Sequence, residues 1–194
     1  HLGGWEIAAR LLQHYGRNHP GMRLLLFLGQ KRGEQIEQRQ KRSASESGIR
    51  VVSMPEEGST GMEILEGLQF LREGGLVSMT GDRIWSSGQR AVTVRFAGGL
   101  ARIPEIPYIL SLVSGAPLIL FFGYRTREGG YHLSASEPIA VTAASRVERQ
   151  EAIRSAAQAY ADLLASQART HPDQWFHFDP FLLRLPDIPS CAAP

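Results

Sequence analysis

Residues 22–29 read MRLLLFLG, a short apolar run that ends in glycine. A continuous apolar run of this length is typical of a strand that is buried on both faces of a parallel sheet. Two strand-like runs follow it, IRVVSMP at 49–55 and LVSMTGDR at 76–83. Between these two, residues 59–75 carry an amphipathic stripe and a Gly-Gly stop, which predict a helix. This succession predicts an α/β fold, with a mostly parallel mixed sheet flanked by helices and right-handed crossovers.

Helical patterns also lie on either side of the first strand. Residues 5–15, WEIAARLLQHY, place apolar side chains on one face of a helix. Residues 31–48 are polar and compatible with a helix that closes at Gly48.

The second half of the chain predicts further strands, a loop and two helices. Its aromatic end, PDQWFHFDPF at 172–181, is expected to pack back on the domain. The expected elements are a strand at 91–96, a Gly/Pro-rich loop at 97–107, a short helix at 108–115, a buried strand at 116–125, its antiparallel partner at 131–139 and the longest helix at 145–171.

The length of 194 residues suits one domain, which we expect to span residues 1–185, with a flexible tail at 186–194. The single cysteine, Cys191, excludes an internal disulfide framework and favours a reducing compartment. No run reaches the roughly 18–20 apolar residues of a membrane-spanning helix, and no signal peptide is present. Because the sequence does not begin with methionine, these observations say little about the full-length protein.

The charged residues favour anionic partners other than nucleic acid. Of the 21 basic residues only Lys31 and Lys41 are lysines, and arginine suits the bidentate capture of phosphate or carboxylate. The formal net charge of +2 is too small, and the aromatic residues are too scattered, for a nucleic-acid-binding surface.

The first six residues, HLGGWE, contain a candidate catalytic pair, His1 and Glu6. Residues at this spacing do not meet in a continuous helix, so the pair requires a turn before the helix, which Gly3 and Gly4 allow. A carboxylate beside an imidazole fixes its tautomer and stabilises the imidazolium, so the histidine can act as a general base. The alternative is a capping or surface histidine followed by a favourable first-turn acid.

The same hexapeptide resembles the H-x-x-x-x-D/E block of the lysophospholipid acyltransferase superfamily. It is nearest to the H-[FL]-G-N-W-E of the bacterial lipid A biosynthesis (late) acyltransferase family, from which Gly4 departs. Each later motif is weakly specific alone, but their common order is fairly specific. The segments that resemble this family are VSMTGDRI at 77–84, VRFAGGLARIP at 94–104, SGAPLILFFGYR at 114–125 and HPDQWFHFDPF at 171–181.

The resemblance implies a glycerol-3-phosphate/lysophospholipid acyltransferase-like fold that lacks the family's N-terminal helices, including a membrane-anchoring segment. It implies transfer of a fatty acyl chain from an acyl carrier protein or coenzyme A thioester to a hydroxyl of a membrane glycolipid, such as a lipid A precursor. His1 would deprotonate that hydroxyl and Glu6 would hold the imidazole. No metal, organic prosthetic group or acyl-enzyme intermediate is implied. The expected place is the cytoplasmic face of the bacterial inner membrane.

Four polar residues are candidates for substrate binding. Asp82 and Arg83 follow a predicted strand, where ligand sites of open α/β sheets lie, and they resemble the family's third block. Arg32 resembles its second-block arginine, and Arg102 lies in the predicted glycine-rich loop. The alternatives are a turn with a local ion pair for the first two and basic surface residues for the others.

Other polar residues receive structural interpretations. Arg125 and Arg127 flank the predicted hairpin and are expected to be a solvated rim. His171, His177 and Asp179 fit no zinc signature. The neighbouring aromatic residues are expected to pack together, namely Trp175, Phe176, Phe178 and Phe181.

Three other functions stay open at this point. One is an acyltransferase of a sister branch that acts on an aryl polyene lipid or another glycolipid. The second is a non-catalytic lipid-binding module of the same fold, which the substitution by Gly4 would favour. The third is a hydrolase that uses the same histidine on water.

Overall fold

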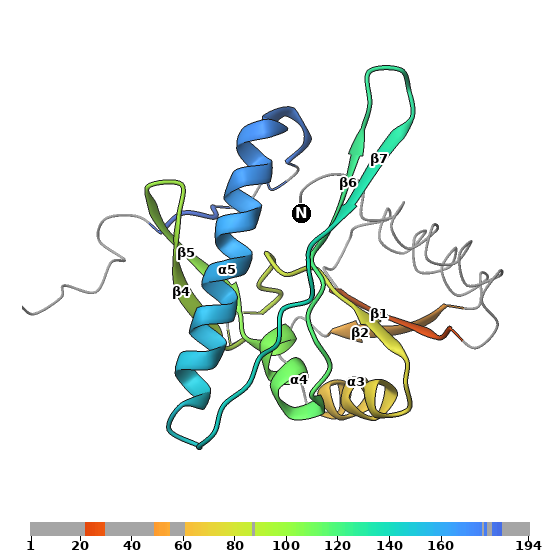
Figure 1. Ribbon diagram of the computed structural model, residues 1–194, viewed down its shortest axis with the longest axis vertical. Helices are drawn as coiled ribbons and strands as arrows, with labels where there is room; N and C mark the ends of the chain where they lie inside the picture. The colour runs from red at the N-terminus through yellow and green to blue at the C-terminus, as the bar shows by residue number, and fades with distance from the viewer. Residues whose placement is uncertain are drawn as a thin grey trace, which may run out of the picture.

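The computed structural model describes residues 22–29, 49–54, 61–86, 88–175, 177 and 180–183. Within them the chain has a mixed α/β fold, in which a parallel three-stranded sheet packs against helices (Figure 1). The helices predicted at 5–15 and 31–48 and the tail at 186–194 lie outside the described residues. Among the described residues, no helix combines the length and the apolar character needed to cross a bilayer.

The parallel sheet is built around β1 (Leu24–Gly29), which lies between β2 (Arg50–Met54) and β3 (Leu76–Ser78). All six residues of β1 are buried. Successive side chains of a strand point to opposite faces, and the structure shows two separate clusters accordingly. Leu25 and Phe27 join one cluster, whereas Leu24, Leu26 and Leu28 join another. The predicted strand buried on both faces is therefore confirmed.

The helix α3 (Met62–Arg72) follows β2 and packs beside α4 (Ile106–Ser114). It approaches β1 closely at Gly67, where a methyl group would lie 3.0 Å from the Phe27 ring. The helix stops at the predicted glycine pair, because Gly74 adopts a left-handed φ of 78° and the Gly75 amide donates to the Phe70 carbonyl.

The second half contains two antiparallel strand pairs and two helices. The pair of β4 (Ala91–Phe96) and β5 (Gly99–Pro104) is joined by a tight turn at 97–98, in which both residues have positive φ. Residues 99–104 were expected in a loop, so that prediction is wrong. They form a strand because each pairs with a residue of 91–96.

The short helix is confirmed with bounds shifted towards the N-terminus, and the second hairpin is confirmed with shorter strands. The helix is α4 (Ile106–Ser114), and the hairpin joins β6 (Phe121–Arg125) to β7 (Tyr131–Ala135). The predicted strand at 116–125 is correct only for its last part. Before β6, Leu118 makes an isolated bridge to Ile139. The hairpin projects from the body of the molecule (Figure 1).

The predicted longest helix is α5 (Arg149–Thr170), which lies along β4 (Figure 1). Alternate residues of β4, Val92, Val94 and Phe96, point into the core that they share with α5. The helix can lie close to the strands because it buries mostly small residues there. These are Ala156, Ala157, Ala161 and Ala165.

Two glutamine side chains bind the backbone of edge strands. The Gln158 amide of α5 accepts from the Arg95 N–H at 2.8 Å and donates to the Arg95 carbonyl at 2.9 Å. The Gln174 amide does the same for Arg125, at 2.8 and 3.0 Å. We call each arrangement a glutamine clasp. Each satisfies both polar groups of one residue on a strand edge that the hairpin partner does not cover.

Replacing Gln158 with alanine is expected to lower the free energy of unfolding by about 1–2 kcal/mol, because two backbone hydrogen bonds are lost. Urea denaturation followed by circular dichroism measures the change. The matched control is Gln69→Ala, since the Gln69 amide bonds to the exposed Glu73 side chain rather than to a strand. Equal effects of the two substitutions would contradict a stabilising role for the clasp.

Candidate functional site

The candidate site begins where β3 ends, at the carboxyl edge of the parallel sheet. Residues 80–85, which we call the GD turn, follow this short strand. Ligands of open α/β sheets bind at this edge. The turn brings the Trp85 ring against Gly29 at the end of β1. A methyl group at Gly29 would lie only 2.5 Å from this ring. The absence of a side chain at Gly29 therefore lets Trp85 pack against β1.

The GD turn rests on α5 at Gly81. A methyl group at Gly81 would lie 2.9 Å from Cζ of Tyr160 and 3.1 Å from its hydroxyl oxygen. These distances are too short for a real side chain, so the glycine permits the contact between turn and helix. Burial raises the pKa of the Tyr160 phenol well above its usual value, and the Asp82 carboxylate and Tyr108 raise it further.

Asp82 and Arg83 differ in their exposure. Asp82 is only 2% exposed, and its carboxylate acts on the buried Tyr160 phenol. Arg83 is intermediate between buried and exposed. In this arrangement the Asp82 side chain belongs to the interior of the turn, whereas Arg83 is the more accessible of the two.

The C-terminal segment covers the other side of the GD turn. Nε2 of His177 lies 3.4 Å from the Asp82 carbonyl oxygen. The His177 ring packs edge-on against Trp175 and Phe181, and both of these rings contact Phe96 of β4. The predicted packing of Trp175 and Phe181 is thus confirmed. Phe176, Phe178 and Asp179 lie outside the described residues.

His171 and His177 contact different parts of the structure. His171 stacks on Tyr124 of β6 with a centroid distance of 3.9 Å, whereas His177 contacts the GD turn. The described ranges contain no group of three His, Cys, Asp or Glu residues that could hold a metal ion.

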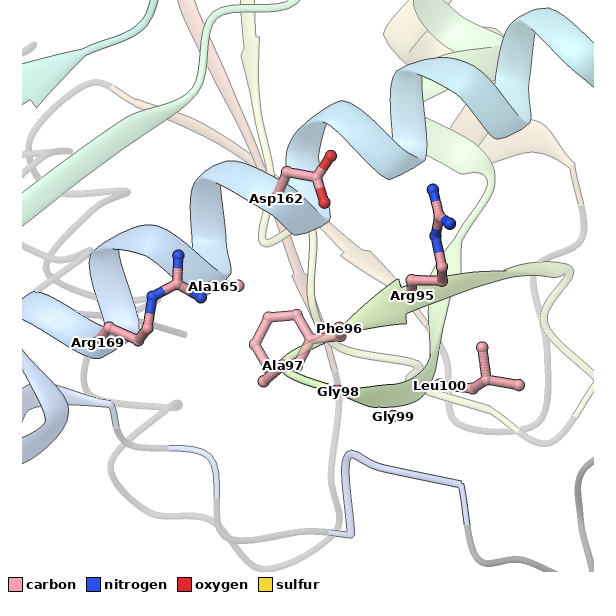
Figure 2. Close-up of a pocket in the computed structure, with 9 residues that line it drawn as sticks. All are labelled: Arg95, Phe96, Ala97, Gly98, Gly99, Leu100, Asp162, Ala165 and Arg169. Atoms are coloured by element: carbon pink, nitrogen blue, oxygen red, sulfur yellow. The ribbon is translucent and has the colours of Figure 1, made fainter.

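A separate open hollow of about 590 Å³ lies between the β4–β5 turn and α5. Arg95 and Arg169 lie on either side of the Phe96 ring (Figure 2). No candidate residue from the sequence lines this hollow. Its Phe96 floor does connect to the GD turn, because Phe96 packs on Phe181, which packs on His177.

The arrangement of a polar turn at the carboxyl edge of a parallel sheet fits many enzymes, and sequence comparison decides between them. The profile of the bacterial lipid A biosynthesis acyltransferase family matches residues 1–184. The chain belongs to this family. No curated protein matches the chain significantly.

Membership in the bacterial lipid A biosynthesis acyltransferase family establishes the class of reaction. The protein is an acyltransferase, and its family implies acyl transfer in lipid A biosynthesis with an acyl donor and a lipid acceptor. This confirms the resemblance drawn from the sequence motifs.

The structure places some of the acyltransferase's candidate residues and not others. Asp82 and Arg83 lie together in the GD turn. Arg102 lies on β5, exposed and opposite Thr93, so its predicted place in a glycine-rich loop is wrong. His1, Glu6 and Arg32 lie outside the described residues.

Sequence reasoning missed the residues that support the GD turn, namely Trp85, Tyr160 and His177. Tyr160 has no local signal, because it is one apolar position of a long helix. His177 does have one. It lies in the closing segment that resembles the family, although on sequence grounds it is considered only as a metal ligand.

Replacing Gly81 with alanine is expected to destabilise the fold by about 1–3 kcal/mol, because the new methyl group overlaps the Tyr160 ring. Gly88→Ala is the matched control, since nothing lies within 4 Å of a methyl group at that position. Thermal and urea denaturation of both variants measure the difference. If the two substitutions have the same effect, the contact with Tyr160 does not constrain the turn.

Proposed function

We propose that the protein moves a fatty acyl chain from an acyl carrier protein or coenzyme A thioester to a hydroxyl of a membrane glycolipid such as a lipid A precursor. Family membership over residues 1–184 is the observation that carries this proposal. The H-x-x-x-x-E pattern of His1 and Glu6 supports the mechanism, because it supplies the two groups that activation of a hydroxyl needs.

In the proposed reaction, the imidazole of His1 takes the proton of the acceptor hydroxyl while Glu6 holds the ring. The hydroxyl oxygen attacks the thioester carbonyl, forming the new C–O bond. The C–S bond then breaks, and the imidazolium returns its proton to the departing thiolate. An oriented carboxylate stabilises the imidazolium in the intervening state. The step needs no metal or prosthetic group.

We assign the binding of the acceptor's anionic groups to the GD turn, with Arg83 as its direct ligand. Arg83 is more accessible than Asp82, and the planar fork of a guanidinium suits an anionic group, which together support this role. The burial of Asp82 supports a part in shaping the turn rather than a direct contact. Arg32 and the exposed Arg102 are further candidates for contacts to the acceptor.

We place the reaction at the cytoplasmic face of the bacterial inner membrane, since the implied acceptor is a membrane lipid. Acylation of another lipid, such as an aryl polyene lipid or other glycolipid, is the alternative within the same chemistry. Lipid mass spectrometry of a deletion strain separates the two, because a missing secondary acyl chain on lipid A supports the first.

Replacing His1 with alanine in the full-length protein is expected to lower turnover about 10²–10⁴-fold, because a positioned general base is lost. Acyl transfer to a lipid A precursor and thiol release measure the loss. His132→Ala is the matched control, since His132 is exposed on β7. Near wild-type turnover of the His1 variant would remove the mechanism.

The same assay separates the other two functions. Lipid binding without thiol release would indicate a non-catalytic module, and free fatty acid as the sole product would indicate a hydrolase.

Replacing Arg83 with alanine is expected to raise the KM for the lipid acceptor by roughly tenfold or more, because a charge-assisted contact to an anionic group is lost. The KM for the thioester donor is expected to stay unchanged. Steady-state kinetics in both substrates test this, with Arg72→Ala as the control, since Arg72 is exposed at the end of α3. A rise in the donor KM instead would place Arg83 in the donor site.

A further inference from the structure

We propose that His177 is a positioning residue for acceptor binding, which holds the GD turn through the backbone carbonyl of Asp82. This inference rests on the proposed function of the turn. It gives the C-terminal segment a part in the reaction that the segment's aromatic packing alone does not explain.

The contact itself joins distant parts of the chain. Nε2 of His177 lies 3.4 Å from the Asp82 carbonyl oxygen, across 95 residues of sequence. In the tautomer that carries its proton on Nε2, the imidazole donates a hydrogen bond to that carbonyl. The bond is made to the backbone, so it fixes the path of the turn at the residue directly before Arg83.

The ring of His177 is held in place by its aromatic neighbours. Its centroid lies 4.9 Å from that of Phe181 and 6.0 Å from that of Trp175, in both cases with an interplanar angle of 61°. Edge-to-face packing of this kind is favourable and fixes the direction of the ring. Phe181 and Trp175 are themselves anchored on Phe96.

The segment that carries His177 is fastened on both sides of it. Before it, the Gln174 clasp binds the Arg125 backbone of β6. After it, Leu182 bridges Ala101 of β5, and the Leu183 amide donates to the Leu100 carbonyl at 2.8 Å. Because the segment is fixed on both sides, His177 can restrict the position of the turn that it contacts.

The GD turn needs such support, because its own strand is short. β3 has three residues and pairs with β1 through them. On the α5 side, the close contact at Gly81 is a steric one with the Tyr160 ring. His177 adds a directional hydrogen bond from the C-terminal segment.

The test compares His177→Ala and His177→Gln with wild type in the full-length protein, with His132→Ala as the control. The alanine variant is expected to raise the KM for an underacylated lipid A precursor about three- to tenfold, as for the loss of one hydrogen bond. Its donor KM and its thioester hydrolysis without acceptor are expected to stay at wild-type values. Glutamine places an amide N–H near the position of Nε2, so it is expected to restore the acceptor KM.

Hydrogen exchange supplies a readout that does not depend on activity. Faster exchange of the amides at 80–85 in the alanine variant, reversed by glutamine, shows that His177 holds the GD turn, whether or not acyl transfer is found. Wild-type protein that consumes no thioester would defeat the proposed function and the part in acceptor binding with it, and the exchange result would still decide whether His177 holds the turn. An unchanged acceptor KM together with unchanged exchange overturns the proposal. So does a loss of stability that lowers kcat and leaves both KM values alone.

Discussion

The burial of β1 on both faces is the constraint on which the rest of the structure depends. A strand whose residues are all buried needs a layer on each side and a partner strand along each edge. The chain supplies β2 and β3 as the partners and α3 and α4 as part of one layer. Because both partners run parallel to β1, the carboxyl ends of all three strands meet at one edge. The GD turn lies there for that reason.

Two glycines allow close packing around this edge of the sheet. Gly29 lets Trp85 lie against the end of β1, and Gly81 lets the turn settle on Tyr160. Neither position has room for a side chain, so the turn is placed by the Trp85 ring against the β1 backbone and by its own backbone against the Tyr160 ring. If Arg83 binds the acceptor as proposed, these contacts restrict the segment that carries it, which lowers the entropic cost of binding.

The parts of the fold that could be predicted are those that leave a local pattern. The apolar run of β1, the stripe of α3 with its glycine stop and the long helix α5 all do so. β5 could not be predicted, because its glycine and proline read as a loop and only pairing with β4 makes it a strand. For the same reason Arg102 was wrongly expected in a loop. The contact of His177 with the GD turn could not be predicted either, because it joins residues that are 95 positions apart in the sequence.

The glutamine clasps have a consequence for how the edges of the two hairpins can pair with other chains. An uncovered strand edge offers its N–H and C=O groups to any extended peptide nearby and is a starting point for cross-β polymerisation. At Arg95 and Arg125 both groups are already occupied by an amide of the same chain. A foreign strand would have to displace that amide before it could add in register. The clasps therefore oppose strand addition at these two positions of the hairpin edges.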